Sequence, residues 1–193
     1  MISVSIQKIK PDMKKLKRKF HVKTAREEGI LGKVHERIRQ ALDPRYSYRK
    51  VSFDAPPMDS LISGSKELAS FLMGTKEGFV VICTIGSAPC RVIDEYQKSG
   101  DMISALYADR TASDAVENLA EHVESALLNK FFDLDKYVFT KRYSPGYGDL
   151  PLEKQKDLFA LFNPIELDVT LTPENYMHPE KSISYIVGVL PKR

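Results

Sequence analysis

The sequence contains no tryptophan, only two cysteines and no long apolar run. Two cysteines in 193 residues exclude a disulfide-dense secreted scaffold. No stretch approaches the roughly 18 apolar residues that a membrane helix needs. The first residues, MISVSIQKIK, also lack the apolar stretch and cleavage site of a signal peptide. We therefore expect a cytoplasmic protein with no membrane partner.

The motifs of several common enzyme classes are missing as well. There is no GxSxG, GxxxxGK[ST] or HExxH motif. The four histidines are scattered singly, and the spacing of Cys83 and Cys90 fits neither a zinc knuckle nor a CxxC redox pair. We interpret the two cysteines as buried small hydrophobic residues. Neither a metal site nor a catalytic residue is expected.

Positive charge is concentrated near the start of the sequence. Residues 8–23 contain eight Lys or Arg residues and one Asp, whereas the whole chain has a net charge of only +3. Such a segment can be a solvated surface, or it can contact an acidic partner or a nucleic acid. Only Phe20 and His21 are interleaved with the basic residues. Nucleic-acid binding usually combines more aromatic side chains with basic ones, so no nucleic-acid partner is expected.

The hydrophobic pattern mixes strand and helix periods along the chain. Alternation of Ile2, Val4 and Ile6 predicts a strand at the start of a basic segment that covers residues 1–23. Thr24 and Glu27 form a capping-box pattern at the start of a helix. The predicted helices are 24–42, 65–73, 88–98, 101–131 and 152–162, the last stopped by Asn163-Pro164. The other segments with strand character are 46–53, 78–85, 137–140, 167–171 and 182–189.

These elements do not alternate as regular βαβ units. The sequence therefore predicts an α+β fold with a largely antiparallel or mixed twisted sheet. Helices flank this sheet, including one long helix over about 101–131. No repeat or long linker divides the chain, so residues 1–193 are predicted to form a single domain.

One loop, residues 142–151, combines side chains suited to ligand binding. Arg142 can hold a carboxylate with its planar, forked guanidinium group. Tyr147 can stack on a planar ring or lie against a cation. Gly146 allows a ligand to approach the backbone closely. These features suit a small zwitterionic ligand with an aromatic or cationic part; the alternative is an ordinary structural turn.

The six residues from Arg142 to Tyr147, RYSPGY, resemble the R-x-[AS]-x-G-Y signature of the activation domain of cobalamin-dependent methionine synthase. Further segments resemble that family in the same order, from the long helix to near the end of the sequence. They are the LAE of residues 119–121, the helix at 151–161, the LT at 171–172 and the MHPEKSIS of residues 177–184. No single motif is specific to the family, but the motifs in this order and spacing together make a specific match.

The resemblance implies that the loop binds S-adenosylmethionine. Arg142 would hold the carboxylate of the ligand, and Ser144 would offer backbone hydrogen bonds. Gly146 belongs to the same signature, and Tyr147 would lie near the sulfonium or its methyl group. Glu121 would interact with the ammonium group.

The helical period gives a separate view of Glu121. It places Glu121 on the side of the long helix opposite its apolar stripe, together with Glu117 and Glu124. Such a face is usually solvated. It can line a ligand cleft only if the cleft lies on the outer side of the helix.

The sequence departs from the family pattern at two ligand contacts. An aspartate in a Trp-Thr-Pro-Phe-like context has no counterpart, and the C-terminal tyrosine of the family would fall beyond Arg193. Tyr185 is a candidate to substitute for that tyrosine. The cobalamin and folate modules of the known enzyme have no counterpart either.

The resemblance implies an activation domain encoded as a separate protein and connected to methionine biosynthesis. It would act in trans in the reductive methylation of cob(II)alamin, on a methionine synthase that lacks this domain. It would thus be a component of a methyltransferase rather than a complete enzyme, with a flavodoxin-like reductant as a further partner. The alternative is a scaffold without ligand that docks a corrinoid or flavodoxin-like partner through residues 8–23. A methyltransferase with its own small substrate ranks last, because the glycine-rich first-strand loop is missing.

Overall fold

The computed structural model describes residues 2–9, 11–162 and 168–192. Its helices are α1 (Met13–Lys19), α2 (Ala25–Ala41), α3 (Met58–Ser63), α4 (Lys66–Phe71), α5 (Ala88–Lys98), α6 (Met102–Phe131) and α7 (Gln155–Phe159). Its strands are β1 (Ile2–Ser3), β2 (Arg45–Ser52), β3 (Glu77–Thr84), β4 (Tyr137–Phe139), β5 (Thr170–Leu171), β6 (Met177–His178) and β7 (Ser182–Pro191). The predicted helix stop at Asn163-Pro164 and the start of the predicted segment 167–171 lie outside the described residues.

Five strands form one antiparallel sheet in the order β1-β2-β3-β7-β4, and β5 pairs with β6 in a separate hairpin. The predicted α+β fold with a largely antiparallel sheet is therefore confirmed. β3 lies at the centre, where Val80 pairs with Arg49 of β2 on one side and with Ile186 of β7 on the other. A central strand with both faces covered is expected to be apolar throughout, as this one is.

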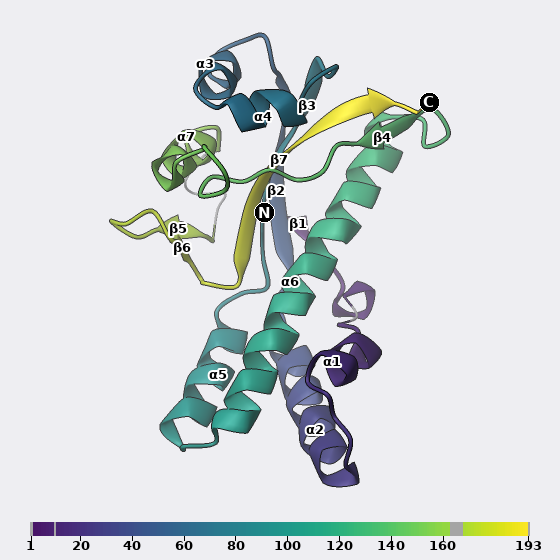
Figure 1. Cartoon of the computed structure of the whole chain (residues 1–193), viewed down its shortest axis with the longest axis vertical. Helices are drawn as coiled ribbons and strands as arrows, with labels where there is room; N and C mark the ends of the chain where they lie inside the picture. The colour runs from purple at the N-terminus through teal and green to yellow at the C-terminus, as the bar shows by residue number, and fades with distance from the viewer. Residues whose placement is uncertain (1, 10, 163–167, 193) are drawn as a thin grey trace.

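The side chains of β3 alternate between two hydrophobic clusters, one on each face of the sheet. Phe79, Val81 and Cys83 belong to the first cluster, with α2, α5 and α6. Val80 and Ile82 belong to the second cluster, with α3, α4 and α7. The sheet is thus the middle layer of the protein, and each cluster is the core on one side of it (Figure 1).

Helix α6 has 30 residues and crosses the first face of the sheet diagonally (Figure 1). Leu119, Val123 and Leu127 on its apolar stripe are 0–1% exposed. The predicted long helix and its stripe are therefore confirmed. Because the helix extends beyond the sheet, its first half packs against α2 and α5 instead (Figure 1).

The start of α2 has the capping box that the sequence predicts. The backbone N–H of Glu27 donates to Thr24 Oγ1 at 3.2 Å, and the N–H of Thr24 donates to Glu27 Oε2 at 3.0 Å. Each bond satisfies an N–H group that lacks an intrahelical partner. Gly74, three residues after the end of α4, has φ +83°, a backbone conformation that L side chains rarely adopt.

The first 23 residues differ from the prediction. Among the described residues of this segment, only Ile2–Ser3 is a strand, a 3₁₀ turn covers Ile6–Lys8, and five of the eight basic residues lie in α1. This helix is held by the buried carboxylate of Asp114 on α6, which accepts from the N–H of Asp12 at 2.8 Å and from Lys15 Nζ at 2.7 Å. Asp12 and Asp114 are 102 positions apart in the sequence, so no local sequence pattern could predict their contact.

Three short elements also differ from the prediction. α3 and β6 lie in segments that carry no clear period, and the predicted helix 152–162 is a 3₁₀ turn at Leu152–Lys154 followed by the short α7. Helices of one to two turns depend on tertiary contacts rather than on intrinsic propensity. All three elements lie on the second face of the sheet or at its edge.

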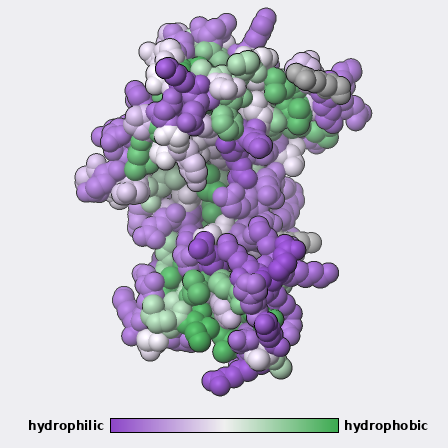
Figure 2. Space-filling model, in the orientation of Figure 1, coloured by the Kyte–Doolittle hydropathy of each residue, from purple (hydrophilic) through white to green (hydrophobic). Residues whose placement is uncertain are grey.

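Hydrophilic side chains cover much of the face shown in Figure 2, whereas apolar side chains gather near its lower end, over α5 and the start of α6. Met102, Ile103 and Leu106 are exposed there. None of the helices in the described part of the chain is long and apolar enough to cross a membrane.

Candidate functional site

The loop that follows β4 is fixed to the sheet at its start. The N–H of Tyr143 donates to the carbonyl of Ile186 on β7 at 3.0 Å, and the N–H of Ile186 donates back at 2.8 Å. Farther along, the N–H of Gly146 donates to the carbonyl of Leu150 at 2.9 Å. Gly146 has φ +88°, which strongly favours glycine. The signature segment is therefore a closed turn with a defined backbone.

A second set of hydrogen bonds ties this loop to the N-terminus of α4. The carboxylate of Asp149 accepts from the hydroxyl of Ser65 and from the N–H of Lys66 at 2.8 Å and of Glu67 at 3.3 Å. The bond from Ser65 contributes most to lowering the pKa of Asp149. A carboxylate at a helix N-terminus is favourable because it satisfies unpaired N–H groups.

The phenol of Tyr143 reinforces the same connection. Its hydroxyl lies 3.1 Å from Glu67 Oε2 and 3.1 Å from the backbone carbonyl of Tyr147, so it can donate to either oxygen. Burial, with the nearby Glu67 carboxylate as a smaller cause, raises the pKa of Tyr143, which favours the neutral, donating form. The carboxylate of Glu67 is thereby held beside the loop.

Arg142 lies between the loop and the middle of α6. Its Nη1 is 2.9 Å from Glu117 Oε2, and its Nε is 3.2 Å from Glu124 Oε1. The guanidinium also lies 5.5 Å from the ring centre of Tyr185. Burial opposes the charged form of Arg142, but Glu124 and Glu117 outweigh it and raise the pKa of the guanidinium.

Glu124 is the more buried of the two carboxylates that face Arg142. Burial raises its pKa, whereas the charge of Arg142 lowers it. Its Oε1 is close to Arg142 Nε but has no well-aligned hydrogen bond. Arg142 is thus held in place by charge attraction from α6 and is not locked by a complete hydrogen-bond network.

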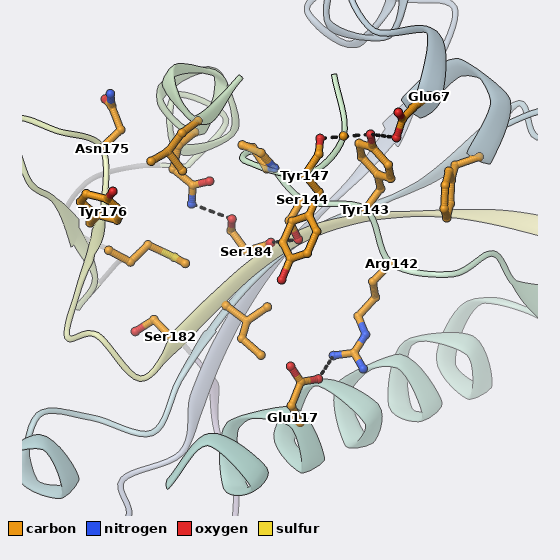
Figure 3. A pocket seen from close by; sticks show the side chains of 17 residues that line it. Glu67, Glu117, Arg142, Tyr143, Ser144, Tyr147, Asn175, Tyr176, Ser182 and Ser184 are labelled. Carbon is orange, nitrogen blue, oxygen red and sulfur yellow. Dashed lines mark hydrogen bonds and ion pairs between the residues drawn. The ribbon is translucent and has the colours of Figure 1, made fainter. Parts of the chain in front are cut away.

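These residues surround a cavity of about 570 Å³ (Figure 3). Its volume lies within the range of small-molecule sites. The walls come from α4, α6, the loop, α7, the β5–β6 hairpin and β7. The residues that line it are Glu67, Phe71, Glu117, Arg142, Tyr143, Ser144, Pro145, Tyr147, Gly148, Leu152, Gln155, Asn175, Tyr176, Met177, Ser182, Ile183 and Ser184.

Three of the five predicted site residues line this cavity, namely Arg142, Ser144 and Tyr147. The hydroxyl of Ser144 donates to the carbonyl of Ser184 at 2.7 Å, and the ring of Tyr147 is 68% exposed. Gly146 is not a lining residue, but its positive φ shapes the turn. The loop therefore presents one guanidinium and one free aromatic ring to the same space.

Glu121 lies outside the residues that line the cavity, and its side chain is exposed. Glu117, about one helical turn earlier, is the lining carboxylate of α6. The cavity therefore lies on the outer side of the helix, the side that the period assigned to all three glutamates. Tyr185, the candidate substitute for the C-terminal tyrosine of the family, is fully buried, donates to the carbonyl of Ala120 at 3.3 Å and packs against the guanidinium of Arg142.

Sequence reasoning missed two parts of the wall. Glu67 and Phe71 come from α4, and nothing in their local pattern distinguishes them from other helical residues. The other part is the β5–β6 hairpin, with Asn175 and the 63% exposed Tyr176. Only Met177, within the segment that resembles the family, could have indicated that the hairpin lies here.

The described residues include no group of three His, Cys, Asp or Glu side chains that could hold a metal ion. Cys83 is buried, and burial raises its pKa to about 12, which keeps the thiol protonated and unreactive. Cys90 is half-buried.

No model of a protein family and no curated protein matches the sequence. A similar solved structure is the crystal structure of the MetH reactivation domain bound to S-adenosylhomocysteine. The TM-score is 0.66 at 13% sequence identity, and the match covers 97% of this chain and 77% of that chain. This chain has the MetH reactivation-domain fold. The region that matches the MetH domain is nearly the whole of this chain, so it includes the elements that form the cavity.

Proposed function

We propose that the cavity binds S-adenosylmethionine. One observation carries this proposal: the RYSPGY loop places Arg142 and the exposed ring of Tyr147 in one cavity of suitable size. The similar MetH domain was crystallised with S-adenosylhomocysteine, the same molecule without the transferable methyl group, which supports this choice of ligand.

The charges of the cavity suit the amino-acid end of this ligand. The guanidinium of Arg142 binds the carboxylate, and Glu117, which now pairs with Arg142 at 2.9 Å, accepts the ammonium group. When the ligand binds, the ion pair between Glu117 and Arg142 is replaced by one pair between Arg142 and the carboxylate and one between Glu117 and the ammonium group. Neither charge is then left unpaired. Glu121, to which the resemblance assigns the ammonium group, lies one turn farther along α6 and is the second candidate for this role.

The remaining predicted residues position the other parts of the ligand. Tyr147 lies near the sulfonium and its methyl group, where its ring face can attract a cation. Ser144 and Gly146 supply the backbone of the closed turn against which the ligand rests. No general acid or base is required for these tasks.

We further propose that the protein acts in trans on a cobalamin-dependent methionine synthase without its own activation domain. The partner's cobalamin would supply the chemistry: one electron from a flavodoxin-like reductant and the methyl group of S-adenosylmethionine would restore methylcobalamin from cob(II)alamin and leave S-adenosylhomocysteine. The contribution of this chain is to hold the methyl group in position, which raises the effective concentration of two weak reactants. The chain is then a component of a methyltransferase in methionine biosynthesis.

Calorimetric titration with S-adenosylmethionine tests ligand binding. A charge-assisted bidentate pair contributes about 1.5–3 kcal/mol, so Arg142→Ala should weaken binding by roughly ten- to 150-fold. Arg142→Lys keeps the charge but not the fork, and we expect intermediate affinity. No heat of binding at millimolar ligand, with folded wild-type protein, would contradict the proposal.

The role in trans has its own experiment. A methionine synthase truncated after its cobalamin module is inactivated to the cob(II)alamin form and mixed with this protein, the ligand and a reduced flavodoxin. We expect the methylcobalamin absorption spectrum to return with wild-type protein and much more slowly with Arg142→Ala. No recovery with a wild-type protein that binds the ligand would contradict the role in trans and leave the binding proposal intact.

A scaffold without ligand is the second candidate, because Arg142 already has two carboxylate partners within the chain. In that case the exposed basic residues of α1, among them Lys14, Arg18 and Lys19, would dock an acidic corrinoid or flavodoxin-like partner. Capture of such a partner that is sensitive to salt, but unaffected by Arg142→Ala or by added ligand, would favour this candidate.

A further inference from the structure

The wall of the cavity carries more negative than positive charge. Its described lining residues include two carboxylates, Glu67 and Glu117, and a single basic side chain, Arg142. Arg142 is already shared between Glu117 and Glu124 of α6. The charge of Glu67 has no such cation among the lining residues. A cavity with this balance favours a ligand with net positive charge.

Glu67 is held in one place by the loop. Its Oε2 lies 3.1 Å from the hydroxyl of Tyr143, which lies 3.1 Å from the carbonyl of Tyr147 (Figure 3). On the other side the carboxylate touches the backbone of Gly148 so closely that a Cβ at that position would collide with it. The negative charge is therefore fixed beside the backbone of residues 147–148, and it lines the same cavity as the ring that the proposed function places near the sulfonium.

Glu117 is a poorer candidate for recognising a sulfonium. Its carboxylate lies 2.9 Å from Arg142, which compensates most of its charge, and it faces the part of the cavity where the amino-acid end would bind. Glu67 comes from α4, on the other side of the loop (Figure 3). The two carboxylates thus act on different parts of the same ligand.

We infer that Glu67 makes the cavity selective for the cationic sulfonium of S-adenosylmethionine over the neutral thioether of S-adenosylhomocysteine, an inference that rests on the proposed function. The two molecules differ by one methyl group and one positive charge. A nearby carboxylate attracts the positively charged sulfonium and has no such attraction to the uncharged thioether. The same residue therefore favours loading of the methyl donor and release of the spent ligand.

The test compares three ligands within each variant by calorimetry: S-adenosylmethionine, S-adenosylhomocysteine and sinefungin, in which a carbon bearing a protonated amine replaces the sulfonium. Wild-type protein should bind the two cations more tightly than the thioether, by roughly fourfold or more, the factor for two unit charges about 5 Å apart in water. Glu67→Gln should bring this ratio close to one and leave the affinity for S-adenosylhomocysteine nearly unchanged. Because the ratio compares ligands within one variant, a smaller fraction of folded protein affects all three measurements alike and leaves the ratio unchanged.

Glu153→Gln is the matched control, since Glu153 is an exposed carboxylate that does not line the cavity. It removes the same charge and should keep the wild-type ratio. The inference is overturned if wild-type protein binds all three ligands equally, or if Glu67→Gln weakens all three by the same factor, which indicates a purely structural role. Either result leaves the proposed function standing, whereas failure of every ligand to bind wild-type protein removes both.

Discussion

The two faces of the central sheet are covered in different ways. On the first face, long helices pack against β3 and β7, and α6 alone contributes 30 residues. On the second face, the cover consists of the short helices α3, α4 and α7 together with the loop and the hairpin. The first face has a continuous apolar core, whereas the elements of the second face border a cavity beside their core, to which α6 adds Glu117. Regular packing stabilises the fold, and irregular packing leaves room for a ligand.

The largest expected effect is on stability, from truncation of either core. Leu31 on α2 and Leu158 on α7 are both 0% exposed, so Leu31→Ala and Leu158→Ala should each lower the free energy of unfolding by about 2–5 kcal/mol. Denaturant unfolding measures this. Only Leu158→Ala should also weaken binding of S-adenosylmethionine by folded protein, because α7 carries the lining residue Gln155, whereas none of the described lining residues lies on α2. Equal effects of both variants on affinity would break the comparison between the faces.

Two glycines with positive φ provide a second, smaller test. Gly148 in the loop has φ +53° and Gly100 between α5 and α6 has φ +78°. An added methyl group at Gly100 meets open space, so Gly100→Ala should cost only the backbone strain, about 1–2 kcal/mol, and leave ligand affinity intact. At Gly148 the methyl group also collides with Glu67 and the Tyr143 hydroxyl, so Gly148→Ala should cost more and lose ligand binding. Thermal unfolding and calorimetry distinguish the two outcomes.

Substitution of Tyr147 should affect binding alone. Its ring is 68% exposed and contributes little to either core. Tyr147→Ala should weaken S-adenosylmethionine binding by about 1 kcal/mol, the contribution of one ring–cation contact, with little change in melting temperature. Tyr147→Phe keeps the ring face and should bind nearly as the wild type does. A marked loss in Tyr147→Phe would mean that the hydroxyl, not the ring, contacts the ligand.

The smallest expected effect is a pH dependence of stability at the connection between the loop and α4. Hydrogen bonds, chiefly from Ser65, hold the pKa of Asp149 below its usual range. A pKa lowered by folding means that the ionised carboxylate stabilises the protein above its unfolded-state pKa, and that this contribution disappears as the pH falls. Melting temperatures between about pH 5 and pH 3 should therefore fall slightly more steeply for wild-type protein than for Asp149→Asn. Parallel curves would show that the carboxylate charge contributes nothing here.

The first face could be predicted from the sequence more completely than the second. The stripe through Leu119, Val123 and Leu127 repeats at the helical period, and it gives both the length of α6 and the side that is buried. α3 and β6 could not be predicted, because their segments carry no clear helix or strand period. Their conformations depend on contacts with distant parts of the chain.

The same distinction holds within the site. Arg142 and Tyr147 were predicted because they lie close together in one recognisable loop. Glu67 could not be predicted, because it reaches the cavity only through the bonds from the N-terminus of α4 to Asp149, more than eighty positions away in sequence. The helical period predicts which face of α6 carries the lining carboxylate, but it cannot distinguish Glu117 from Glu121, since the two are about one turn apart on that face.

The position of β7 affects how the protein assembles on the ribosome. This strand follows every other described strand in the sequence, yet it lies between β3 and β4. Until it is synthesised, β3 has an unpaired, strongly apolar edge, and the loop that bonds to Ile186 has no support. Such an edge can pair with another nascent chain, so the growing polypeptide is exposed to aggregation until the last strand has been added.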